Sequence, residues 1–126
     1  LATAFSLLSG TPMIYLHPSR DGQGHVIEGT YSSGQTVLII DDLITGGRSV
    51  VQTATRLTEE NLIVEDALVL LDRQQGGQMR LKREGINLAA ILTLEAVLRY
   101  LGTSNKISPE WYHQSLEYLG KPHDTP

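Results

Sequence analysis

The stretch of residues 37–50 constrains the fold of this chain more than any other segment. Four consecutive apolar residues, 37–40, precede Asp41 and Asp42, and the turn 45–49 then leads into a helical pattern. An apolar run without alternation indicates a strand buried on both faces, as in a parallel sheet covered by helices. Ligands of such sheets bind at the carboxyl ends of the strands. We therefore expect function at the two carboxylates and the turn.

Strand and helix patterns alternate along the rest of the chain, which predicts an α/β domain. Apolar runs predict strands at 13–16, 26–31, 36–42, 67–71 and 88–92, and helical spacing predicts helices at 1–9, 48–61, 78–84, 94–101 and from Ser108 onward. We expect the first helix to cover one face of the sheet. Because 126 residues are too few for two cores, residues 1–120 should form a single domain and 121–126 a tail.

Composition excludes several function classes. A net charge of −4 with scattered basic residues disfavours a nucleic-acid surface, and no apolar run approaches the roughly 18 residues of a membrane span. The absence of cysteine excludes disulfides and thiolate zinc sites, and makes a cytoplasmic setting the default expectation. The start at Leu1 lacks both a methionine and the charged region of a signal peptide, so we interpret it as cut rather than targeting.

The turn consists of Thr45, Gly46, Gly47, Arg48 and Ser49. Glycines let backbone amides converge, the following helix adds its positive N-terminal dipole, and the two hydroxyls supply further donors. This combination predicts a phosphate pocket. A glycine pair alone would more often simply join a strand to a helix, but the order of strand, acidic pair and turn favours the pocket.

The carboxylates Asp41 and Asp42 repel phosphate and therefore need another partner. Sugar hydroxyls donate hydrogen bonds to carboxylates, and so do waters around a Mg²⁺ ion carried by the ligand. Together with the turn, the pair predicts a ribose phosphate site.

At this point the chain resembles a known family. The segment Ile39–Ser49 resembles the phosphoribosyl-pyrophosphate (PRPP) signature of type I phosphoribosyltransferases. Segments at 12–14, 27–29, 69–77 and 85–88 narrow the resemblance to orotate phosphoribosyltransferases, including those fused to orotidylate decarboxylase, over residues 1–101.

The resemblance implies a type I phosphoribosyltransferase fold, with a parallel sheet flanked by helices. It implies a glycosyltransferase of pyrimidine (UMP) biosynthesis that converts orotate and PRPP to orotidine 5′-monophosphate and pyrophosphate with Mg²⁺. It also implies a homodimer, fused to or associated with the decarboxylase in some relatives, without a nucleic-acid or membrane partner.

The resemblance also assigns roles to residues of this chain. Asp41 and Asp42 would bind the ribose hydroxyls, the turn 45–49 would bind the 5′-phosphate, and Arg73 would contact the carboxylate of orotate. The magnesium would have no direct protein ligand and would reach the acidic pair through water. A guanidinium suits a planar carboxylate because its fork binds both oxygens, although a surface Asp72–Arg73 ion pair is the alternative.

The segment 16–25 departs from the family, whose mobile loop carries cations that close over pyrophosphate. Leu16 stands at the family's arginine and His17 at its first lysine, whereas Arg20 and Asp21 match its Lys-Asp pair. We take His17, Arg20 and Asp21 as catalytic candidates, with a protonated His17 replacing part of the lost charge. An equally open interpretation makes His17 an exposed loop residue without a role.

The family's first strand and its hood over the base are expected to be missing. In the family this strand lies between the two that we place at 13–16 and 36–42. The sheet should therefore have a gap at that position.

Two other function classes remain open. A non-catalytic relative would keep the PRPP or nucleotide pocket for a structural or regulatory role, which the altered loop favours. A phospho-receiver domain also places an acidic pair after an apolar strand, with Asp72 and Thr93 further on. Such a domain needs a lysine after the strand 88–92, and the next one is Lys106.

Overall fold

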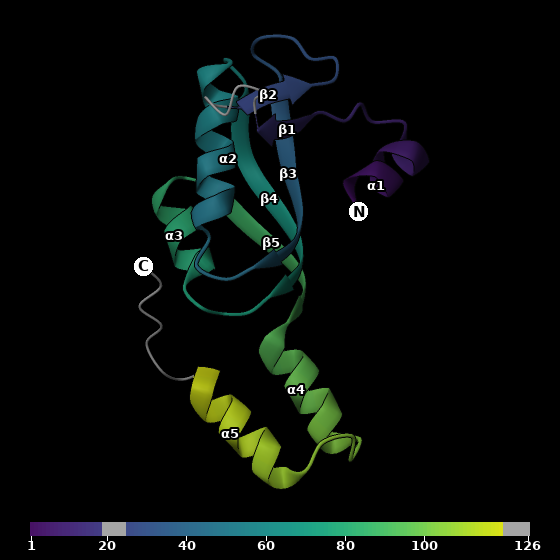
Figure 1. Ribbon diagram of the computed structural model, residues 1–126, viewed down its shortest axis with the longest axis vertical. Helices are drawn as coiled ribbons and strands as arrows, with labels where there is room; N and C mark the ends of the chain where they lie inside the picture. Colours follow the sequence, from purple (N-terminus) through teal and green to yellow (C-terminus); the bar gives the residue numbers. More distant parts are fainter. Residues whose placement is uncertain (19–24, 120–126) are drawn as a thin grey trace.

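The computed structural model describes residues 1–18 and 25–119, apart from the side chain of Pro18. In chain order its elements are α1 (Ala2–Ser9), β1 (Tyr15–Pro18), β2 (His25–Glu28), β3 (Thr36–Ile44), α2 (Arg48–Glu59), β4 (Ile63–Asp72), α3 (Gly77–Arg83), β5 (Asn87–Thr93), α4 (Leu94–Thr103) and α5 (Pro109–Leu119) (Figure 1). The tail expected at 121–126 lies outside the described residues.

Three parallel strands form the main sheet in the order β3-β4-β5. The register pairs Ile44 with Asp72, and Asp72 with Thr93, at the carboxyl ends of the three strands. Residues that follow these strands therefore meet at one edge of the sheet. The alternation of parallel strands and helices confirms the predicted fold class.

The core lies between the sheet and the helices α2 and α3. Alternate residues of a strand point to opposite faces, and those on this face are buried together with the apolar stripes of the two helices. The buried residues are Ile39, Ile44, Val50, Ala54, Leu57, Leu62, Ala67, Val69, Leu81 and Ile86. Since short connections join β3 to α2 and β4 to α3, the packing of these helices on the sheet positions both connections.

The opposite face of the sheet is not covered as the sequence predicts. On that face Leu38, Leu70 and Ile91 are 45%, 41% and 59% exposed. We expect the first helix to cover one face of the sheet. However, α1 buries none of its own residues, and Leu8 is 90% exposed. Helical spacing of apolar residues correctly predicts the helix but does not determine what it packs against.

The strands β1 and β2 form an antiparallel hairpin that is separate from the main sheet. In the described residues β1 is not hydrogen-bonded to β3, and a cavity of about 380 Å³ lies between residues 11–16 and β3. Its position agrees with the gap expected between these two strands.

The helices α4 and α5 extend away from the sheet as a hairpin (Figure 1). The hydroxyl of Ser108 accepts a hydrogen bond from the amide of Trp111 at 3.3 Å, which confirms Ser108 as the N-cap of α5. Among residues 1–18 and 25–119, no helix is long and apolar enough to cross a bilayer.

We predict that Leu81→Ala lowers the free energy of unfolding by about 2–5 kcal/mol, since Leu81 is fully buried between α3 and the core. The control is Met79→Ala on the same helix, where the side chain is 63% exposed and the loss should be about 0.5 kcal/mol or less. Urea unfolding measures both variants. Equal losses would contradict this description of the core.

Candidate functional site

The acidic pair lies on β3, near the carboxyl end of the strand. The strand continues to Ile44, two residues beyond its predicted end, so both carboxylates belong to the strand. Asp41 is half-buried and Asp42 is exposed, and the Oδ1 atom of Asp41 accepts a hydrogen bond from the amide of Asp42 at 2.9 Å. This bond holds the Asp41 carboxylate in place and leaves Asp42 open to a ligand.

A shallow cavity of about 500 Å³ lies beside this pair. Its lining residues are Leu1, Ala2, Thr3, Met13, Tyr15, Ile40, Asp41 and Asp42. Because both apolar side chains and carboxylates line this space, a sugar ring would find hydrogen-bond acceptors and apolar contact there.

The turn after β3 leaves the N-terminus of α2 open. Gly47 is the N-cap with a left-handed φ of 77°, and it offers no side-chain cap. The amide of Val51 donates to the carbonyl of Gly47 at 3.1 Å, so the amides before Val51 precede the first helical hydrogen bond. Amides at a helix N-terminus bind anions because they combine free donors with the positive end of the dipole.

The turn after β3 packs directly on the loop after β4. A Cβ atom on Gly47 would lie 2.7 Å from Cδ1 of Leu81, and one on Gly77 would lie 2.6 Å from the carbonyl oxygen of Thr45. At Gly77 a methyl group would meet the backbone, whereas at Gly47 it would displace the tip of the Leu81 side chain and strain a left-handed φ. The two loops are therefore in backbone contact, and the first loop is positioned by the second.

Arg73 follows β4 at the same edge. Its amide donates to the carbonyl of Ile44 at 3.0 Å, which fixes its backbone against the end of β3. The carboxylate of Asp72 is buried and accepts from the amide of Gln74 at 2.7 Å. In the described part of the chain the structure shows no ion pair between Asp72 and Arg73, so this alternative loses its support.

His17 does not lie in a loop as the sequence predicts. It belongs to β1, where its Nε2 atom lies 3.0 Å from Oε1 of Glu28 without the geometry of a hydrogen bond. The ring of Tyr15 lies 4.4 Å from the imidazole. The sequence does not predict this because the two hairpin strands are only four residues long, which is too short for a clear alternation of apolar and polar residues. Arg20 and Asp21 lie outside the described residues.

Two residues to which the sequence assigned no role make contacts around the site. Glu28 contacts His17, and Gln74 bonds the first turn of α4 through its side chain. The sequence offers a weak signal for Gln74, which follows the Asp-Arg pair in a loop, and none for the pairing of Glu28 with His17. Both contacts join residues whose proximity depends on strand pairing.

The acidic pair fits a magnesium ion that brings most of its own ligands. Among residues 1–18 and 25–119, no three His, Asp or Glu side chains converge on one point, so these residues form no all-protein metal cage. Mg²⁺ bound with substrate phosphates commonly needs only one or two carboxylates, directly or through water. Asp41 and Asp42 can fill that role.

The pKa of the Asp41 carboxyl is raised above its usual value. The main cause is burial, which disfavours the charged form, and the neighbouring Asp42 carboxylate adds to it, while the hydrogen bond from the Asp42 amide acts in the opposite direction. Keeping this carboxylate charged therefore costs stability, and a ligand that donates hydrogen bonds to it would offset that cost.

Comparison with known proteins identifies relatives of this chain. It is 38% identical to orotate phosphoribosyltransferase of Caenorhabditis elegans over 124 residues, covering 97% of the chain. Among solved structures, UMP synthase of Leishmania donovani matches 94% of the chain with a TM-score of 0.82 and 33% identity, and orotate phosphoribosyltransferase of Aeropyrum pernix matches 80% with a TM-score of 0.70 and 32% identity. No protein-family model matches the chain.

These relatives confirm the resemblance read from the motifs and the type I phosphoribosyltransferase fold. The chain spans 55% of the length of the C. elegans relative, 56% of the A. pernix structure and 26% of the L. donovani structure. The matched part contains the acidic pair, the turn and Arg73.

We predict that Asp41→Asn raises the free energy of unfolding at pH 7. A raised carboxyl pKa means that the folded state binds the proton of Asp41 more tightly than the unfolded state does. The stability that this proton contributes is lost as pH rises through the folded pKa. Asparagine keeps the acceptor oxygen without the charge. The gain over wild type should shrink as pH falls through the raised pKa of Asp41, because the wild-type carboxyl is then protonated as well.

Urea unfolding of wild type and variant, at pH 7 and at successively lower pH, measures this difference. A variant that is less stable than wild type at pH 7, or a gain that does not change with pH, would contradict the assigned cause.

Proposed function

We propose that this chain forms the PRPP-binding part of an orotate phosphoribosyltransferase. In this reaction a ring nitrogen of orotate displaces pyrophosphate from PRPP, which gives orotidine 5′-monophosphate. The observation that supports it best is the arrangement at the carboxyl edge of the sheet, where the acidic pair on β3, the open N-terminus of α2 and Arg73 after β4 follow neighbouring strands. The similarity to orotate phosphoribosyltransferases and UMP synthase supports the same substrates.

Each part of the site has a separate task in this proposal. Asp41 and Asp42 accept hydrogen bonds from the ribose hydroxyls, which fixes the sugar. The amides and hydroxyls of the turn, from Thr45 through Gly46, Gly47 and Arg48 to Ser49, bind the 5′-phosphate. These contacts hold the sugar in place while positive charge develops at its anomeric carbon, so the rate comes from positioning and charge stabilisation.

Arg73 recognises the carboxylate of orotate in this proposal. Its backbone is fixed by the bond to the carbonyl of Ile44, and no ion pair of the described residues occupies its guanidinium. Arg73 is half-buried, and a guanidinium without a counter-charge suits a planar carboxylate, which it binds through both oxygens.

Magnesium would neutralise the pyrophosphate of PRPP when bound, with Asp41 and Asp42 as the residues nearest to its waters. His17, Arg20 and Asp21 are the proposed pyrophosphate-handling residues, of which His17 would act in its protonated form. Leu16, at the family's arginine position, packs against the core instead of supplying a charge. The proposal also includes a homodimer and a cytoplasmic location. It includes fusion to orotidylate decarboxylase, which the match to UMP synthase supports.

We predict that the full-length protein converts orotate and PRPP to orotidine 5′-monophosphate, and that the double variant Asp41→Asn, Asp42→Asn loses about a hundredfold or more in kcat/KM for PRPP. Each charge-assisted hydrogen bond contributes about 1.5–3 kcal/mol, so the loss of two gives this range. Steady-state kinetics with varied PRPP measures it.

Asp66→Asn is the matched control, because Asp66 is an exposed carboxylate in the first half of β4 and bonds Asn87 at 3.0 Å. Its kcat/KM should stay within twofold of wild type. PRPP binding by calorimetry without turnover would instead identify a non-catalytic relative with a structural or regulatory role.

A further inference from the structure

The loop after β4 holds Arg73 between two fixed points. On one side the amide of Arg73 bonds the carbonyl of Ile44 at 3.0 Å. On the other side the amide of Gln74 bonds the buried carboxylate of Asp72 at 2.7 Å. The backbone on both sides of the Arg73 side chain is therefore tied to the ends of β3 and β4.

Gln74 has an unusual backbone conformation for its residue type. Its φ is 58°, in the left-handed region that side-chain-bearing residues rarely adopt. Such a conformation costs stability and persists only where surrounding interactions enforce it. The bond from the Gln74 amide to Asp72 is one of these interactions, and the Gln74 side chain makes another.

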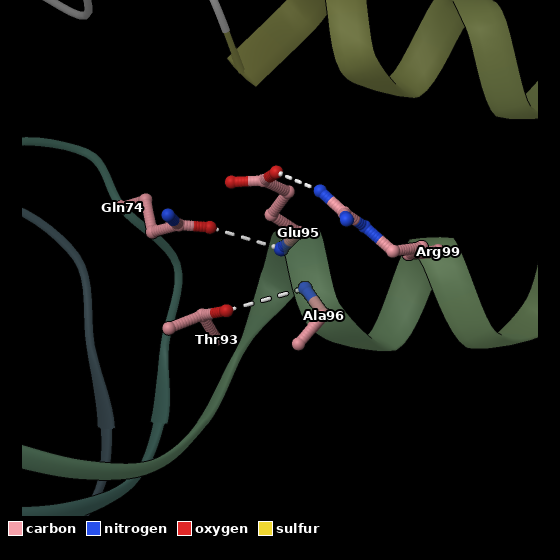
Figure 2. A network of polar contacts seen from close by, with 5 residues as sticks. All are labelled: Gln74, Thr93, Glu95, Ala96 and Arg99. Carbon is pink, nitrogen blue, oxygen red and sulfur yellow. Dashed lines mark hydrogen bonds and ion pairs between the residues drawn. The ribbon is translucent and has the colours of Figure 1, made fainter.

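The side chain of Gln74 reaches the first turn of α4, as Figure 2 shows. Its Oε1 atom accepts a hydrogen bond from the amide of Glu95 at 2.9 Å. Next to it, Thr93 caps the same helix by accepting from the amide of Ala96 at 3.2 Å, and Glu95 pairs with Arg99 at 2.9 Å along the helix (Figure 2). The helix thus has its own cap and its own ion pair.

The bond from Gln74 differs from the local cap because it joins residues 21 positions apart. Thr93 already caps α4 from within its own segment, so α4 does not depend on Gln74 for its start. What the long-range bond adds is a third fixed point for the loop after β4, immediately next to Arg73. A left-handed residue locked by two hydrogen bonds sets the direction in which the preceding side chain leaves the backbone.

We propose that Gln74 is a positioning residue for the recognition of orotate by Arg73, which it achieves by locking the loop against α4. This inference rests on the proposed function, in which Arg73 binds the carboxylate of orotate. The two substrates should respond differently, because Gln74 adjoins Arg73, whereas the PRPP turn contacts this connection three residues further on, at Gly77.

The test measures KM for orotate and for PRPP in the full-length protein carrying Gln74→Asn. Asparagine tolerates a left-handed backbone but is one methylene too short to reach the amide of Glu95. We expect KM for orotate to rise about three- to tenfold, as for the loss of one hydrogen bond, with KM for PRPP within twofold of wild type. Gln74→Glu keeps an acceptor at the same reach and should restore KM for orotate.

Two further variants separate positioning from stability. Gln74→Gly removes the acceptor but relieves the left-handed strain, so it should keep the wild-type melting temperature and still raise KM for orotate. Gln78→Asn is the control, because Gln78 is an exposed residue of α3, and both KM values should remain unchanged.

The outcomes distinguish this inference from the proposed function. Wild-type protein that does not use orotate would overturn both. Wild-type protein that turns over orotate, with Gln74→Asn and Gln74→Gly at wild-type KM for orotate, would overturn only the role of Gln74. Equal rises in both KM values would assign Gln74 a general structural role and would also overturn the inference.

Discussion

The backbone contact between the two glycine-containing loops is the constraint on which the rest of the site depends. Gly47 packs against Leu81, and Gly77 packs against the carbonyl of Thr45, at distances that leave no room for a Cβ atom. Because the loops follow adjacent parallel strands, this contact joins the proposed phosphate-binding turn and the loop of Arg73 into one edge. A methyl group at Gly77 would push the proposed phosphate and base sites apart, because it would meet the carbonyl oxygen of Thr45.

Several features of this edge cost stability. The Asp41 carboxylate is partly buried beside a second carboxylate, and Gln74 has a left-handed backbone. The N-terminus of α2 has no side-chain cap, whereas Thr93 and Gln74 together accept two first-turn amides of α4. The open helix thus follows β3, which bears the carboxylates, whereas the capped helix α4 follows β5 at the same carboxyl edge of the sheet. Because α3 also begins at a glycine without a side-chain cap, the open end of α2 indicates an anionic ligand only together with the carboxylates beside it.

Sequence patterns predicted the elements whose signals are local. The uninterrupted apolar run of β3 correctly predicted a strand, and Ser108 with Pro109 predicted the start of α5, because both depend on neighbouring residues. The expectation that helices bury both faces of β3 was wrong, since Leu38 is 45% exposed. The errors concern packing partners. Helical spacing in α1 could not show that its apolar residues stay exposed, and the position of His17 in a strand depends on pairing with β2. The role of Gln74 depends on a contact with α4, which periodicity does not report.

The most direct test of the central claim is an amide NMR titration of the full-length protein with ribose 5-phosphate, with ribose as the comparison. We expect the amides of residues 45–49 to shift only with the phosphorylated sugar, because its phosphate should bind the open N-terminus of α2. The amides of Asp41 and Asp42 should shift with the same dissociation constant, since the sugar hydroxyls bind their carboxylates. Shifts confined to other parts of the chain, or identical shifts with ribose alone, would contradict a ribose phosphate site at the acidic pair and the turn.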